Sequence, residues 1–169
     1  MYFDDGLLNL MSSTLFARFF LRLPRRSART SLYLHSQSAA MVLRNITCGS
    51  AMLVNTQGVI SVKQLTLLPG SLFNMTTLTS NIVLEAPSIA NGTVLGATGS
   101  GDITLKIDSA RFAGRISLYA RYGSILLKGS QANVVSNKGG TAFFVCLKCN
   151  ASTGIIHLYS NSGNIIAYL

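Results

Sequence analysis

The sequence contains little charge, little proline and no tryptophan, and it lacks long apolar runs. Only 11% of its 169 residues are charged, and just five of them are Asp or Glu. Enzymes that cleave polysaccharides need two or more carboxylates that converge on one face, so this small acidic set argues against a catalytic centre. No apolar run approaches the roughly 18 consecutive residues of a membrane-spanning helix, so we expect no membrane span.

What the sequence does contain favours short strands and tight turns. Apolar residues make up 49% of the chain, and glycine occurs 15 times against three prolines. Abundant Gly, Ser and Thr between short apolar segments are typical of strands joined by turns. The length suits one domain with a continuous core.

The net charge of +9 raises the question of a nucleic-acid partner, but its distribution argues against one. Six Arg and two Asp lie in residues 1–44, and the other eight Lys and Arg are scattered singly along the remaining chain. Binding to phosphates needs a cluster or stripe of cations. We therefore do not expect nucleic acid to be a partner.

A repeat of glycine followed by alternating apolar residues runs through most of the chain. Its units come in pairs about nine residues apart, as at Gly114 and Gly123 or Gly154 and Gly163. The pairs begin every 18 to 22 residues, and a weaker pair near Thr30 and Ala40 extends the series backwards. The pair starts are residues 49, 70, 92, 114, 132 and 154.

The alternation within each unit predicts strands that bury one face. In the segment GRISLY, Ile116 and Leu118 should point inward, while Arg115, Ser117 and Tyr119 should point outward. Glycine suits the corners because it reaches backbone angles that other residues avoid. A unit of this kind cannot bury its own apolar face, so successive units must stack.

The repeat predicts an all-β fold, a parallel β-solenoid of about six or seven coils of roughly 22 residues, over residues 30–169. A β-sandwich or barrel is the alternative, but neither needs a constant repeat length. A third side of each coil should follow the second strand. Its apolar residues at comparable positions are Leu65, Leu67, Leu68, Ile89 and Phe112.

Three segments, GSGDITLKI, YGSILLKGS and TGIIHLYSNSGNIIAY, are similar to the glycine-cornered "SGDI" repeats of the adhesin β-solenoid domain family. The similarity covers roughly residues 45–169 and extends to other right-handed parallel β-helices, including pectate-lyase-like proteins. The resemblance implies the fold and a place at the cell surface. It carries over no catalytic residue.

The N-terminal segment, residues 1–29, is basic and departs from the repeat. Apolar residues over 14–23 share one face of an expected helix, which Pro24 ends. This helix could cap the solenoid, form part of an organelle transit peptide, or lie on a membrane surface. The chain stops within an apolar strand pattern at Leu169, which leads us to expect further solenoid sequence or end-to-end stacking.

The sequence offers no convincing metal or cofactor site. Cys146 and Cys149 have the spacing of half a zinc site, but a second pair is missing and the only histidines are His35 and His157. We expect neither a metal nor a cofactor. The thiols are interpreted as buried or incidental, with a disulfide from Cys48 as the alternative.

Four glycosylation sequons occur, a mild excess over chance. Asn45, Asn91 and Asn150 should lie at exposed corners, whereas Asn74 is expected to be partly inward. These sites favour an extracellular or cell-surface location. An organelle, reached through the N-terminal segment, is the alternative.

The few remaining ionisable groups are expected to be structural. The residues stacked with Asp102 should be Asn81, Ser124 and Asn164, so no row of acids forms, and Asp102 should accept backbone hydrogen bonds at a corner. His157 has no acidic neighbour in register and is interpreted as an exposed strand residue. We therefore expect no catalytic residues.

The outward positions suit binding better than catalysis. Tyr119 and Tyr159 occupy equivalent positions, with Arg115 and Arg121 nearby, and aromatic side chains on a flat β-face are common contact points for sugars or proteins. The sequence thus predicts a non-catalytic, adhesin-like or structural surface module that binds glycan or protein. The alternatives are a pectate-lyase-like enzyme or its fragment, and a basic organelle-targeted protein.

Overall fold

The computed structural model describes the chain in eight segments, and within them it is all-β. Because no helix occurs among these residues, none is long and apolar enough to cross a membrane. The helix expected over 14–23 lies outside the described residues. The described segments are residues 2–4, 7–12, 31–85, 87–108, 112–129, 135–136, 141–148 and 153–169.

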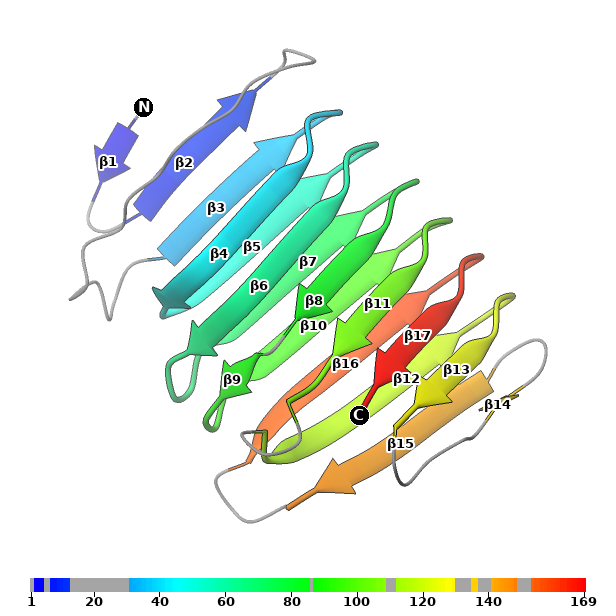
Figure 1. The fold of residues 1–169 in the computed structure, drawn as a ribbon. Helices are drawn as coiled ribbons and strands as arrows, with labels where there is room; N and C mark the ends of the chain where they lie inside the picture. Colours follow the sequence, from blue (N-terminus) through cyan, green and yellow to red (C-terminus); the bar gives the residue numbers. More distant parts are fainter. Residues whose placement is uncertain are drawn as a thin grey trace.

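The strands form two sheets that lie face to face (Figure 1). The nine-stranded sheet has the order β1 (Tyr2–Asp4), β2 (Leu7–Ser12), β3 (Ser31–Ser36), β5 (Ser50–Asn55), β7 (Leu72–Thr77), β10 (Thr93–Thr98), β16 (Gly154–Ser160), β12 (Gly114–Ala120) and β15 (Thr141–Leu147). The eight-stranded sheet has the order β14 (Val135–Ser136), β13 (Ile125–Lys128), β17 (Ile165–Tyr168), β11 (Ile103–Lys106), β8 (Ile82–Glu85), β6 (Ile60–Leu67) and β4 (Met41–Cys48), with β9 (Ser88–Ile89) also beside β6.

The chain alternates between the two sheets. A strand of the nine-stranded sheet leads through a short corner into a strand of the other sheet, and we call such a unit a strand pair. Neighbouring strand pairs are parallel in both sheets, with equivalent residues in register. The strands predicted near Thr30 and Ala40 are confirmed as β3 and β4. The strand pairs are β3/β4, β5/β6, β7/β8, β10/β11, β12/β13 and β16/β17.

The core lies between the sheets and follows the predicted alternation. Ile116 and Leu118 are buried on β12, while Arg115 and Tyr119 on the same strand are exposed. Burial of each such Leu or Ile side chain contributes roughly 1.5–3 kcal/mol. Four of the five residues predicted to form a third side are buried, and the fifth, Leu68, is partly exposed. The four buried residues are Leu65, Leu67, Ile89 and Phe112.

The order of the strand pairs differs from their order in the sequence. The last pair, β16/β17, lies between β10/β11 and β12/β13 and is parallel to both (Figure 1). The serial stacking that the repeat predicted is therefore wrong at the C-terminal end. Every strand pair carries the same pattern of inward side chains and corner residues, so the pattern fixes register but cannot fix which pairs become neighbours.

The unit predicted to begin at residue 132 is also corrected. The strand β15 pairs antiparallel with β12, and β14 pairs antiparallel with β13. Neither continues the parallel stack. The weaker pattern of this unit has glycines together at Gly139 and Gly140, without the corner spacing that the other units share.

A buried polar residue ends most strands of the nine-stranded sheet and holds the following corner. The hydroxyl of Thr98 accepts a hydrogen bond from the Gly101 N–H (2.9 Å) and donates to the carbonyl of Ser80 (3.0 Å). Ser160 makes the same two bonds, with the Gly163 N–H (2.9 Å) and the Gly101 carbonyl (3.2 Å). Each strand end thus closes its own corner and ties it to the neighbouring pair.

Thr77 occupies the equivalent position, but its buried Oγ1 has no hydrogen-bond partner. We expect Thr77→Val to raise the free energy of unfolding by about 1 kcal/mol, because it removes an unsatisfied buried hydroxyl. The matched change Thr98→Val should lower it by about 1–3 kcal/mol, because it leaves two backbone groups unpaired. Urea denaturation followed by far-UV circular dichroism measures both, and equal effects would contradict this assignment of the two hydroxyls.

Candidate functional site

The outward face of the nine-stranded sheet is flat and almost uncharged. On the six strands from β3 to β12, Arg115 is the one outward side chain with a formal charge. Several apolar side chains lie exposed there, among them Met52 and Leu72. Polar side chains lie between them, since Asn74 is the register partner of Met52 and Thr93 is the register partner of Leu72.

Tyr119 and Tyr159 form an aromatic stack on this face. They are register partners on β12 and β16, and their ring centroids lie 5.5 Å apart with an interplanar angle of 12°. The sequence-based prediction that they occupy equivalent outward positions is confirmed. The stack arises although 40 residues separate them, because β16 inserts directly beside β12.

A shallow groove of about 440 Å³ lies next to the stack. Ala97 on β10 is the register partner of Tyr159 on the side away from Tyr119. Its methyl group is too small to cover the tyrosine ring, so the second face of that ring borders the groove. The groove is lined by Val54, Asn55, Thr56, Thr76, Thr77, Leu78, Ala97, Thr98, Gly99, Tyr159 and Asn161.

The two arginines assigned to this site do not share one position. Arg115 lies four residues before Tyr119 on the same strand, about 13 Å away along β12. Arg121 follows the strand at the corner, where its guanidinium lies 4.8 Å from the centre of the Tyr122 ring. The structure therefore brings the two tyrosines together and leaves Arg115 at the far end of the strand.

The outward face of the eight-stranded sheet carries a line of charge. Register pairing places one outward residue from each of six adjacent strands in a row across the sheet. We call this line the charged row. Its members, in spatial order from β4 to β13, are Arg44, Lys63, Glu85, Lys106, Tyr168 and Lys128.

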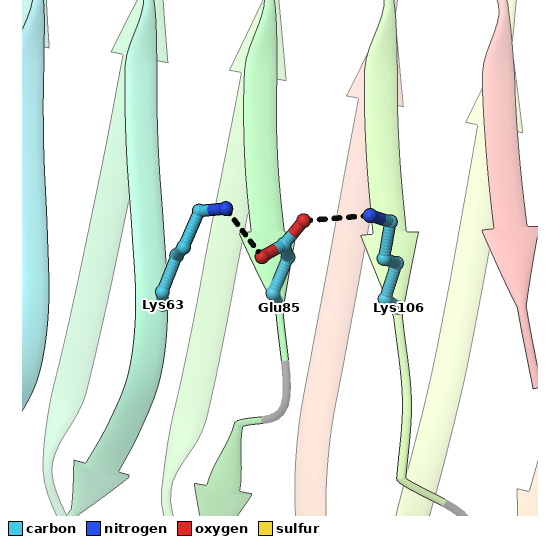
Figure 2. A network of polar contacts seen from close by, with 3 residues as sticks. All are labelled: Lys63, Glu85 and Lys106. Atoms are coloured by element: carbon cyan, nitrogen blue, oxygen red, sulfur yellow. Dashed lines mark hydrogen bonds and ion pairs between the residues drawn. The ribbon is translucent and has the colours of Figure 1, made fainter.

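Glu85 links two lysines within the charged row (Figure 2). Its carboxylate lies 2.8 Å from the Lys63 ammonium and 2.7 Å from the Lys106 ammonium. Hydrogen bonds from Lys106 and then Lys63 lower the pKa of Glu85, and the bond with Glu85 raises the pKa of Lys106. The ionised Glu85 carboxylate therefore stabilises the folded state at pH values above the ordinary pKa of the group. This stabilisation is lost as the pH falls through the lower pKa that Glu85 has in the folded state.

The far end of the charged row combines a cation with an aromatic ring. The Lys128 ammonium lies 5.3 Å from the centre of the Tyr168 ring. Tyr168 separates Lys106 from Lys128 along the row, as their register shows. All three side chains are exposed.

The charged row was missed by the sequence reasoning, which treated the cations as scattered. A signal was present in the sequence. In each strand pair, three corner residues follow the first strand, and the member of the charged row lies five positions after the third of them. Lys106 thus follows Gly101, and Lys128 follows Gly123. Single charges spaced by one repeat length become neighbours when the repeats stack.

The remaining carboxylate of this region, Asp102, is structural, as predicted. Its Oδ1 accepts hydrogen bonds from the Asn164 backbone N–H (2.7 Å) and side-chain amide (3.3 Å). Asn81 and Asn164 in turn accept from the backbones of Asp102 and Ser124, so the predicted stack is confirmed in the order 81, 102, 164, 124. His157 is exposed, and its register partners are Leu95 and Ser117.

The cysteines give no sign of a metal site. Cys48 is a buried free thiol, and burial raises its pKa to about 11, so the alternative of a disulfide from Cys48 is wrong. Cys146, exposed on β15, is disulfide-bonded. Cys149 lies outside the described residues. Within the described segments, no group of three His, Cys, Asp or Glu side chains could hold a metal ion.

Two of the three proposed glycosylation sites can be placed. Asn45 and Asn91 are exposed and adopt left-handed backbone angles, with φ of 51° and 50°. Asn150 lies outside the described residues. Asn74, expected to be partly inward, alternates with buried Phe73 and Met75 and so lies on the outward side of β7.

Comparison of the chain with known protein families, with curated proteins and with solved structures finds no match.

Proposed function

We propose that this chain is a parallel β-solenoid and acts as a non-catalytic, adhesin-like surface module. The regular strand pairs, their parallel register and the columns of corner residues support winding in one direction around a common core. Two flat outward faces, with different chemistry, are then available for ligands.

Glycan is the ligand that the nine-stranded sheet suits best. The single observation that carries this proposal is the groove bounded by the open face of Tyr159 and floored by small residues such as Ala97. A sugar ring has apolar C–H faces that pack against an aromatic ring. Thr76 and Asn161 in the same groove offer hydrogen-bonding groups to sugar hydroxyls.

The arrangement of the carboxylates supports a role without catalysis. The Glu85 carboxylate is paired with two lysines, and Asp102 is engaged by the backbone of the next strand pair. Glu85 is the last residue of β8, whereas Asp102 lies at the corner before β11, at the opposite end of these two paired strands, so the two carboxylates do not converge. Hydrolysis or lyase activity of the purified chain on polysaccharides would overturn this part of the proposal.

An extracellular or cell-surface location follows from the same proposal. Asn45 and Asn91 are accessible to a glycosylating enzyme, since both side chains are exposed, Asn45 at a left-handed position within β4 and Asn91 at a left-handed position before β10. Glycopeptide mass spectrometry of the chain isolated from its source tests this location. Unmodified asparagines at both positions would favour the organelle alternative.

The groove is tested by removing the tyrosine ring that forms its wall. We expect Tyr159→Ala to weaken binding of cellohexaose, a neutral linear glycan, by about threefold to tenfold, because one stacking contact is lost. Isothermal titration calorimetry measures the binding, because its signal does not depend on the tyrosine that is removed. Tyr33→Ala, on the same outward face but outside the groove, is the matched control and should bind normally. Equal binding by both variants would exclude the groove, and a protein ligand would then be the remaining use of this face.

A further inference from the structure

We propose that the charged row on the eight-stranded sheet binds a linear acidic polysaccharide. This site lies on the opposite sheet from the groove and does not depend on it. The row contains four cations and one carboxylate, which leaves a net charge of +3. The described strand pairs and the corners within them contain six Lys and Arg, of which the row holds four; the other two are Arg115 and Arg121.

The three lysines of the row are attached at even intervals. Adjacent strands lie about 4.8 Å apart, so the backbone positions of Lys63, Lys106 and Lys128, on alternate strands, follow one another at intervals of about 10 Å. In the free protein the ammonium groups of Lys63 and Lys106 lean toward Glu85 between them. Arg44 extends the line by one strand beyond Lys63. The row is therefore a straight ladder of positive charge across a flat surface.

This spacing fits a sparsely charged, extended polymer. A linear glycan in which every second sugar carries a carboxylate or sulfate presents its anions at intervals of two sugar lengths. Such a repeat matches lysines on alternate strands, and the neutral sugar between two anions would lie over Tyr168, between Lys106 and Lys128. The aromatic ring offers that sugar an apolar contact.

Nucleic acid fits the row less well. A single strand carries one charge per nucleotide, at intervals much shorter than the spacing of these lysines. Proteins that bind single strands also supply several aromatic rings on which successive bases stack. The charged row contains one aromatic residue, Tyr168.

Glu85 limits the binding of anions in the free protein. Its carboxylate occupies the ammonium groups of Lys63 and Lys106, at 2.8 and 2.7 Å, so a polyanion must compete with it (Figure 2). It also holds both lysines along the line of the row. Removal of its charge should therefore strengthen the binding of a polyanion.

The experiment measures binding of keratan sulfate and of hyaluronan, a sulfated and a carboxylated linear polysaccharide that carry an anion on every second sugar, by isothermal titration calorimetry in low salt. We expect Lys106→Gln/Lys128→Gln to bind both about tenfold more weakly, since two exposed charge contacts are lost. Arg115→Gln/Arg121→Gln removes the same net charge outside the row and should bind as the parent does. Glu85→Gln should bind about threefold more tightly.

The remaining measurements decide between polymers and between the two proposed sites. Single-stranded DNA and phosphatidylserine vesicles should bind less tightly than hyaluronan, and tighter binding of either one through the row would overturn the assignment to a polysaccharide. Equal loss in both double variants would show that only net charge matters and would also overturn it. Cellohexaose binding in Lys106→Gln/Lys128→Gln should be unchanged, so the charged row can fail while the groove stands. Circular dichroism checks that each variant keeps its fold.

Discussion

Replacement of Gly163 by alanine is expected to lower the free energy of unfolding by about 3 kcal/mol. Gly163 is the third residue of the corner between β16 and β17, and a Cβ there would overlap the carbonyl group of Gly101 on the next strand pair. The obstacle is backbone, so rotation of a side chain cannot relieve it. The corner would have to move away and would weaken the Ser160 bonds to Gly101 and Gly163.

The cost at Gly163 comes from space, because its backbone is outside the left-handed region that favours glycine. Equilibrium urea unfolding, monitored by far-UV circular dichroism, gives the change in free energy. Ser162→Ala is the control: it is the adjacent, exposed residue of the same corner, and we expect a change within about 0.5 kcal/mol. A Gly163→Ala protein as stable as the parent would mean that the strand pairs can separate locally at little cost.

The same corner column explains why local features of the fold were predictable from the sequence. Gly101, Gly123 and Gly163 each sit where a Cβ would meet the backbone of the neighbouring pair. Tight stacking therefore favours glycine at this position of the repeat, which is glycine in four of the six strand pairs and Ala39 or Ser80 in the other two. The alternation of apolar residues is the second signal in the sequence. Strand positions, inward faces and the stacking of Asp102 with Asn164 all follow from these two signals.

The spatial order of the strand pairs could not be predicted in the same way. The corner of β16/β17 carries Ser160, Gly163 and Asn164, and it forms hydrogen bonds with the corners on both sides. A pattern shared by all units contains no information about which unit lies beside which. The insertion depends on the long path from β13 to β16, including the antiparallel strand β15, which the repeat did not indicate.

The candidate sites, like the fold, could be predicted from the sequence only in part. Tyr119 and Tyr159 were recognised because both belong to well-formed repeats, and their equivalence holds whatever the order of the pairs. The charged row was overlooked because a linear reading counts charges along the chain, whereas the sheet gathers residues that are one repeat apart. Arg115 was assigned to the tyrosines by sequence distance, although four residues along a strand span about 13 Å.

Removal of residues 154–169 is expected to abolish cooperative unfolding, although it takes away only the C-terminal end of the chain. Both edges of β16 and of β17 are paired, so the deletion removes one of the two neighbours of β10, β11, β12 and β13. The gap is two strand spacings, about 10 Å wide, and it opens through the middle of the core. Far-UV circular dichroism in urea should show a broad, non-cooperative change.

Deletion of residues 1–12 provides the contrast, because β1 and β2 lie at the edge of the nine-stranded sheet. Only β3 loses a partner, so we expect a cooperative transition at a moderately lower urea concentration. A synthetic peptide of residues 153–169, added to the C-terminally truncated chain, should restore the cooperative transition by filling the gap. If the truncated chain instead unfolds cooperatively near the parent midpoint, then β12 can close directly onto β10, and the inserted strand pair is not what holds the two halves of the stack together.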